Sequence, residues 1–204
     1  MKNIAVVFGG FSSEHEVSVK SGKFIYENLK DNQSLNVYQI CISKESNYVI
    51  YDNNKYDLDY MNLSFNINGE KINLDGIFNI IHGEPGENGD LANILEKNNI
   101  PQTGCNSFVS DLTFDKKRYI DFVNKLDIPS SKHILLTSEN QFDLEKIMSE
   151  INIPCIVKPN NGGSSIGVSK VNHIYDLENK IKIAFKECNE AVSYTHLRAH
   201  ETQS

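Results

Sequence analysis

The junction between an apolar run and two glycines near the amino terminus constrains the fold most strongly. Ile4 to Phe8 is a run of β-branched and apolar residues, Gly9 and Gly10 follow at once, and a helical pattern of apolar residues continues to Leu29. A short apolar run favours a buried strand, and the periodicity after it favours an amphipathic helix. A strand, a glycine turn and a helix in this order predict an α/β fold.

The same alternation continues along the chain. Strands are predicted at 37–42, 77–81, 132–136, 153–158 and 168–171, helices at 111–126 and 174–188, and a hairpin turn at Asn68-Gly69. In the helix at 111–126, we expect four residues to face inward: Phe114, Tyr119, Phe122 and Leu126. Short connections between strands and helices favour a parallel sheet in the first part of the chain. Ile100-Pro101 closes that part, which places a domain boundary near residue 102.

Charge and composition exclude several classes of partner. The formal net charge is -7 and the lysines are scattered, so the chain repels nucleic-acid phosphates and anionic lipid. Its apolar runs fall far short of the ~20 residues that span a membrane. The four cysteines, Cys41, Cys105, Cys155 and Cys188, form no CxxC pair. We therefore expect reduced cysteines in a cytoplasmic protein, and neither a zinc site nor a disulfide framework.

The first motif with chemical content is GGFSSEHEVS at residues 9–18. Its two glycines let the backbone approach a ligand, and the free N–H groups at the start of the helix can bind a carboxylate or phosphate. Glu14 and Glu16 are open to a second interpretation, as acids favoured at a helix N-terminus. A dinucleotide-binding fold requires G-x-G-x-x-G, which this order of residues does not provide.

Two further loops follow buried strands. HGEPGENG at residues 82–89 lies where open α/β sheets bind ligands, although a capped loop with a structural His82 is the alternative. KPNNGGSSIGV at residues 158–168 combines a strand-end lysine with amide and hydroxyl donors that can hold phosphate. It is not a Walker A loop, because its lysine precedes the glycines. The alternative there is a flexible hairpin.

Taken in order, these motifs resemble one enzyme family. GGxSxExxVS, HGxxGExG, Phe-Asp-Lys at 114–116 and VKPxxxGSSxGVxKV are similar to the D-alanine–D-alanine ligases over residues 1–192. The resemblance implies a Rossmann-like, pre-ATP-grasp parallel-sheet domain at 1–102, followed by an incomplete α+β ATP-grasp domain at 103–192. It also implies that ATP converts one D-alanine to an acyl phosphate, which the amine of a second D-alanine attacks, in peptidoglycan precursor synthesis. ATP and Mg²⁺ as cofactors, a cytoplasmic location and a homodimer are implied as well.

The resemblance also assigns roles to residues. Glu14 and Ser164 are the expected catalytic residues. Glu14 would hold the ammonium group of the first D-alanine, Val17 would shape the pocket for its methyl group, and His82 would lie beside the same substrate. ATP would be bound by Lys116, Lys158, Gly163, Ser164, Ser165 and Gly167. The loop at 162–167 would close over the γ-phosphate, with Ser164 tying it toward Glu14, whereas Glu87 is expected only to organise its own turn.

The end of the chain departs from the family pattern. The last residues, SYTHLRAHETQS, lack the Asn, Lys and Ile that are abundant elsewhere, so we expect a non-native tail at 193–204. The adenine-binding strand and the magnesium ligands of the family have no counterpart, so no metal ligand is expected here. We therefore expect a truncated chain that is inactive alone, in which Leu177, Ile181, Ala184 and Phe185 lack part of their cover. A D-alanine–D-lactate ligase, a D-alanine–D-serine ligase and a non-catalytic fragment remain the alternatives.

Overall fold

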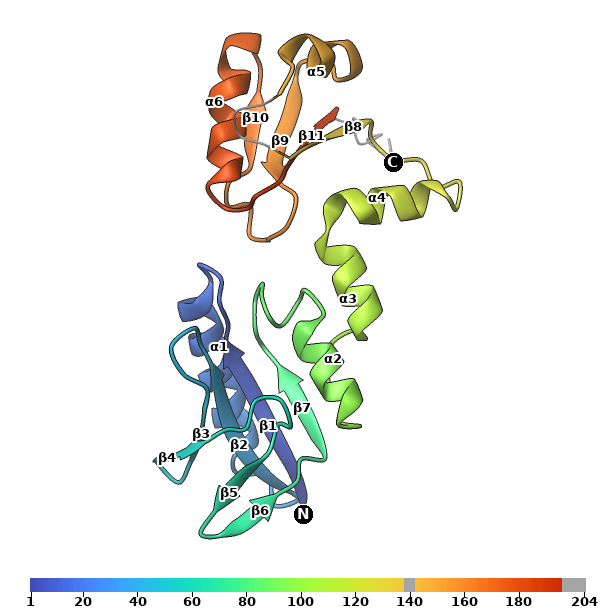
Figure 1. The fold of residues 1–204 in the computed structure, drawn as a ribbon. Helices are drawn as coiled ribbons and strands as arrows, with labels where there is room; N and C mark the ends of the chain where they lie inside the picture. The colour runs from blue at the N-terminus through green and yellow to red at the C-terminus, as the bar shows by residue number, and fades with distance from the viewer. Residues whose placement is uncertain (138–141, 196–204) are drawn as a thin grey trace, which may run out of the picture. The chain divides into compact units, whose positions relative to one another are not determined.

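The computed structural model describes residues 1–137 and 142–195, which belong to two compact units (Figure 1). The first unit is Met1–Asp111, and the second begins at Leu112. This division falls inside helix α3 (Ser107–Phe114), later than the boundary expected at residue 102. Strand β11 (Ala191–Thr195) runs past the expected start of the tail, and residues 196–204 lie outside the described part. Within that part, no helix has both the length and the apolar composition to cross a membrane.

The first unit is built on a five-stranded sheet in the order β4-β3-β2-β1-β7. These strands are β1 (Lys2–Gly9), β2 (Leu35–Ile42), β3 (Tyr48–Tyr51), β4 (Asn54–Asp57) and β7 (Gly76–Asn79). The central strand β1 pairs in parallel with β2 and with β7, whereas β3 and β4 extend the sheet as antiparallel strands. The expected parallel α/β sheet is thus confirmed. The loops after β1, β2 and β7 leave the sheet at the same edge.

Helices and a small hairpin complete this unit. The helices are α1 (His15–Leu29), α2 (Asp90–Lys97) and the first part of α3, and the hairpin pairs β5 (Phe65–Ile67) with β6 (Glu70–Ile72). Asn68 and Gly69 form its turn with φ angles of 52° and 85°, as the Asn-Gly pair predicts.

Both faces of the central sheet are buried, as parallel strands require. Along β1, Ala5 and Val7 join one apolar cluster, which includes Leu91 and Leu95 of α2. Val6 and Phe8 point to the other face and join a cluster that includes α1. Helix α1 lies close to this face at Gly22, where a β-carbon would be 2.4 Å from Phe8 Cδ1.

The second unit is an antiparallel sheet in the order β10-β9-β11-β8. Its strands are β8 (His133–Leu136), β9 (Cys155–Pro159), β10 (Ser169–Val171) and β11, and its helices are α4 (Lys116–Asn124), α5 (Leu144–Glu150) and α6 (Ile174–Phe185). Leu177, Ile181 and Ala184 are fully buried and Phe185 packs against the same core. The expectation that α6 would lack its cover is therefore wrong, because β9, β10 and β11 supply that cover.

The single helix expected at 111–126 is two helices. The side chain of Asp115 accepts a hydrogen bond from the Arg118 N–H at 2.9 Å, so Asp115 caps a new helix, α4. On α4, Ile120 is buried. Tyr119, Phe122 and Leu126 are exposed and Phe114 is half-buried, so three of the four inward-facing positions were predicted wrongly, because the helix breaks at Asp115.

Candidate functional site

The loop after β1 is shaped by its two glycines. Gly9 and Gly10 have φ angles of 102° and 95°, which side chains rarely adopt. A β-carbon at Gly9 would lie 2.2 Å from the carbonyl oxygen of Ile42, and one at Gly10 would lie 2.6 Å from Ile81 Cγ2. Glycine is therefore required at both positions for the chain to turn between the ends of β2 and β7.

Glu14, Val17 and His82 all lie at this edge of the sheet. Glu14 is the N-cap residue of α1, and its side chain makes no capping hydrogen bond. Val17, one turn along the helix, is 54% exposed, which is unusual for valine in a packed helix. His82 follows β7 and is half-buried. The parallel pairing of β1 with β7 thus brings two separate motifs to one edge.

The HGEPGENG loop holds itself together by local contacts. The Gly83 N–H donates to the Glu87 carboxylate at 2.7 Å, and the Glu87 N–H donates to the Gly83 carbonyl at 2.8 Å. Glu87 thus organises its own turn, as expected.

In the second unit, two lysines line a pocket of about 190 Å³ with the glycine-serine loop. Lys158 lies in β9, and Lys116 is the first residue of α4. The Lys116 ammonium donates to the carbonyls of Asn160 at 3.0 Å and Gly162 at 2.8 Å. The loop residues expected to bind ATP line the same pocket, namely Gly163, Ser164 and Ser165, whereas Gly167 does not line it.

The electrostatics of this pocket favour an anion. Burial, and then the charge of nearby Lys158, lower the pKa of Lys116 to about 8. Burial also lowers the pKa of Lys158, whose ammonium lies 4.3 Å from the ring centroid of Tyr194. Two neighbouring ammonium groups repel each other, and a polyanion between them would relieve that repulsion. The residues present therefore fit the phosphates of a nucleotide.

The loop has a backbone that only certain residues adopt readily. Four of its residues, Gly162, Ser164, Ser165 and Gly167, have positive φ angles of 107°, 48°, 60° and 71°. A β-carbon at Gly167 would lie 2.8 Å from Pro159 Cγ. Gly167 therefore allows the loop to return against the end of β9.

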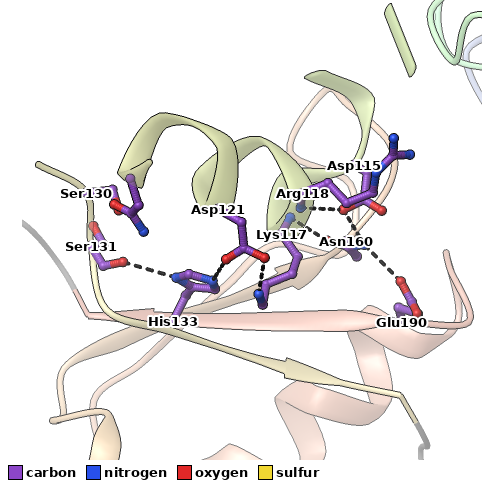
Figure 2. Close-up of polar contacts among 10 residues, drawn as sticks. Asp115, Lys117, Arg118, Asp121, Ser130, Ser131, His133, Asn160 and Glu190 are labelled. Carbon is purple, nitrogen blue, oxygen red and sulfur yellow. Dashed lines mark hydrogen bonds and ion pairs between the residues drawn. The ribbon is translucent and has the colours of Figure 1, made fainter. Parts of the chain in front are cut away.

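Asn160 is the residue of this region to which the sequence assigned no role. It is fully buried, and its amide donates to Asp115 Oδ1 at 3.0 Å and to Glu190 Oε2 at 2.9 Å (Figure 2). Its side-chain oxygen accepts the Lys117 N–H at 3.0 Å. Asn160 thus joins the start of α4 to the end of β9, and so holds Lys116 near Lys158. Its partners are remote in sequence, so periodicity does not reveal them.

A second polar cluster fastens the middle of α4 to β8. Asp121 forms an ion pair with Lys117, and its Oδ1 lies 3.6 Å from Nε2 of the half-buried His133 (Figure 2). The His133 Nδ1 contacts the Ser131 carbonyl at 3.3 Å. The helix that carries Lys116 is therefore held at two points.

Across residues 1–137 and 142–195, no three His, Cys, Asp or Glu side chains gather as a metal site.

Sequence comparisons identify relatives of both units. Models described as "D-ala D-ala ligase N-terminus" and "D-ala D-ala ligase C-terminus" match residues 3–105 and 122–203. The D-alanine–D-alanine ligase of Flavobacterium psychrophilum is 38% identical over 98% of this chain, and that of Flavobacterium johnsoniae is 37% identical. The chain spans 60% of the first of these relatives and 62% of the second.

Solved structures agree with the sequence matches. D-alanyl-alanine synthetase A from Vibrio cholerae has a TM-score of 0.82 at 27% identity, over 97% of this chain and 60% of that one. The VanG D-Ala:D-Ser ligase of Enterococcus faecalis has a TM-score of 0.81 at 28% identity, over 96% of this chain and 63% of that one. With both units matched in sequence and fold, this chain belongs to the D-alanine–D-alanine ligase family.

Proposed function

We propose that this protein acts in the ATP-dependent ligation of two D-alanines through an acyl phosphate, for peptidoglycan precursor synthesis. The observation that supports this most strongly is the pocket of the second unit, in which Lys116 and Lys158 lie beside a glycine-serine loop. Phosphoryl transfer depends on positioning and on neutralising charge, so cations and amide donors are the groups it needs.

In this proposal the second unit binds ATP. Lys116 and Lys158 neutralise phosphate oxygens, and the amides of Gly163, Ser165 and Gly167 hold the γ-phosphate. Ser164 takes part in catalysis by holding the closed loop. Mg²⁺ would add further neutralisation, as it does for nucleotide phosphates generally. ATP supplies the phosphoryl group that activates the carboxylate of the first substrate.

The first unit binds the first D-alanine in the same proposal. The Glu14 carboxylate pairs with the ammonium group, the exposed Val17 side chain contacts the methyl group, and His82 lies beside the substrate. Glu14 is suited to this role because it lies at the N-cap position of α1, at the edge of the sheet where β7 leads into His82. A charge-assisted hydrogen bond from an ammonium group is among the stronger contacts available to it.

A second candidate differs only in the second substrate. The similarity to VanG, whose name states a D-Ala:D-Ser ligase, supports D-serine in that position. D-lactate is the third possibility in this family.

We further propose a cytoplasmic location and a homodimer for this protein. Sedimentation of the purified protein with and without ATP would test the dimer.

The activity test measures ADP release and dipeptide formation. Since the chain spans 60% of the F. psychrophilum ligase, the assay compares two proteins. One is the 204-residue chain, and the other is a chimera of residues 1–192 followed by the part of that ligase that aligns after residue 192 and continues to its end. We expect D-alanyl-D-alanine from the chimera and none from the 204-residue chain.

Three substrates are offered as the second amino or hydroxy acid: D-alanine, D-serine and D-lactate. L-alanine is the control that should yield no product. A folded chimera that releases no ADP with any of them would contradict the proposed function. Product from D-serine in preference to D-alanine would support the second candidate instead.

A further inference from the structure

Two serines of the GGFSSEHEVS motif have no place in the proposed chemistry, yet both bridge separate parts of the first unit. Ser18 is fully buried in the first half of α1. Its hydroxyl accepts the Gly9 N–H at 2.9 Å and donates to the Ile80 carbonyl at 2.7 Å. One side chain thus connects the end of β1, helix α1 and the segment after β7.

Ser12 makes a similar bridge to His82, which lies two residues beyond Ile80 in the segment after β7. Its hydroxyl donates to the His82 carbonyl at 2.8 Å and accepts the Glu14 N–H at 3.2 Å. The Phe11 N–H donates to the Glu84 carbonyl at 2.7 Å, which adds a backbone bond between the same two loops. Ser12 is therefore hydrogen-bonded directly to the backbones of both Glu14 and His82.

The fit between the two loops is close at this point. Gly83 has a φ of 73°, and a β-carbon there would lie 2.8 Å from Ser12 Cβ. A side chain at Gly83 would push Ser12 away from the His82 carbonyl. The glycine of one motif thus makes room for the serine of the other.

We propose that Ser12 is a positioning residue that sets the separation between the Glu14 carboxylate and the His82 imidazole, so that both meet one D-alanine. The Ser12 hydroxyl bonds to the backbones of Glu14 and His82, and so links the two loops at the residues that carry these side chains. Ser18 serves a different purpose, because its two bonds join helix α1 to the end of β1 and to the segment directly after β7. That D-alanine is the ligand rests on the proposed function.

The test compares four variants of the 204-residue chain with the parent: Ser12→Ala, Ser13→Ala, Ser12→Thr and Ser18→Ala. Ser13 is the matched control, because it is the exposed neighbour in the same loop. Nuclear magnetic resonance spectra report the Glu14 amide and the His82 ring, and titration with D-alanine gives an affinity. Thermal melting is measured in parallel.

For Ser12→Ala we expect shifts at the Glu14 amide and the His82 ring and roughly tenfold weaker D-alanine binding, because the two hydrogen bonds that link the Glu14 and His82 loops are lost. Ser13→Ala should resemble the parent in all three signals. Ser12→Thr, which keeps the hydroxyl, should restore them. The melting temperature should fall little in Ser12→Ala, whereas Ser18→Ala, measured for comparison, should lower it clearly because a buried N–H and carbonyl lose their partner.

Three results would overturn the inference. One is an unchanged Glu14 amide and His82 ring in Ser12→Ala. Another is a shift in both signals with no change in D-alanine affinity. The third is an affinity loss in Ser12→Ala that matches its loss of thermal stability and is equalled by Ser18→Ala. If the parent chain binds no D-alanine, the proposed substrate fails, and the Glu14 and His82 signals alone decide whether Ser12 positions these two residues.

Discussion

At the residue scale, the lowered pKa of Lys116 should make the proposed binding of phosphate in the second unit depend on pH. Burial and nearby Lys158 lower its pKa to about 8, from an ordinary value of 10.5. Below pH 8 the side chain is an ammonium that attracts phosphate, and above pH 8 it loses its proton. We therefore expect the affinity for ATP to fall by up to about tenfold per pH unit as pH rises above 8.

Calorimetric titration with ATP between pH 7 and pH 10 would measure this dependence. Lys116→Arg is the matched control, because an arginine side chain stays charged over this range. It should remove most of the loss between pH 8 and pH 9. Equal slopes for the parent and this variant would show that another group is responsible.

Glu14→Gln separates a substrate contact from a general effect of charge at the start of α1. In the chimera we expect the KM for the first D-alanine to rise roughly tenfold or more while the KM for ATP stays the same, because a charge-assisted bond to an ammonium group is lost. Glu16→Gln makes the same change in the first turn of the same helix. If steady-state kinetics show the same change for both variants, Glu14 acts only as an acid that stabilises the helix.

Asn160→Ala should destabilise the second unit. The change leaves the carboxylates of Asp115 and Glu190 without their amide donor, and the Lys117 N–H without an acceptor. Unpaired groups of this kind cost roughly 2–4 kcal/mol in total. The free energy of unfolding in urea measures the loss. Asn161→Ala, which leaves these three bonds intact, is the control, and an equal loss in both variants would contradict the role of Asn160.

At the scale of secondary-structure elements, the approach of α1 to β1 depends on Gly22. Alanine is the better helix former by roughly 1 kcal/mol. Its β-carbon would nevertheless lie 2.4 Å from Phe8 Cδ1, in the core. We therefore expect Gly22→Ala to lower the free energy of unfolding by about 1–3 kcal/mol. A stabilising Gly22→Ala would show that the helix shifts freely.

The sequence predicted the strands and the glycine loops better than it predicted the helices of the second unit. Apolar runs such as Ile4 to Phe8 are local signals, and they located β1 and the start of β7 correctly. The break at Asp115 was missed, because a single aspartate inside a helical pattern does not reveal that it caps a new helix. The bridges made by Ser12 and Asn160 were missed for another reason. Their partners lie far along the chain, and only the fold brings them together.

At the scale of the whole molecule, each unit has an apolar core of its own. The core of the second unit is therefore more complete than the expected loss of cover from α6 implied. A unit with its own core can unfold cooperatively by itself. We expect the chain to unfold in urea in two steps, at different urea concentrations.

Two buried cysteines report on the two cores. Cys41 lies in the first unit and Cys155 in the second, and both are free thiols. Pulsed thiol labelling followed by mass spectrometry should show them becoming reactive at different urea concentrations. Cys105, which is exposed, should react throughout and serves as the control. Coincident labelling of Cys41 and Cys155 at every urea concentration would mean that the chain unfolds as one body.

The hydrogen bonds of Ser12 and Ser18 bear on how a match to the GGFSSEHEVS motif is interpreted. Gly9 and Gly10 adopt positive φ angles, and the two serines hydrogen-bond to the protein's own backbone, so all four positions serve the folding of this loop. A match to these four positions in another chain therefore tests for the fold of the loop. A test for activity needs the residues whose side chains are proposed to meet the substrate.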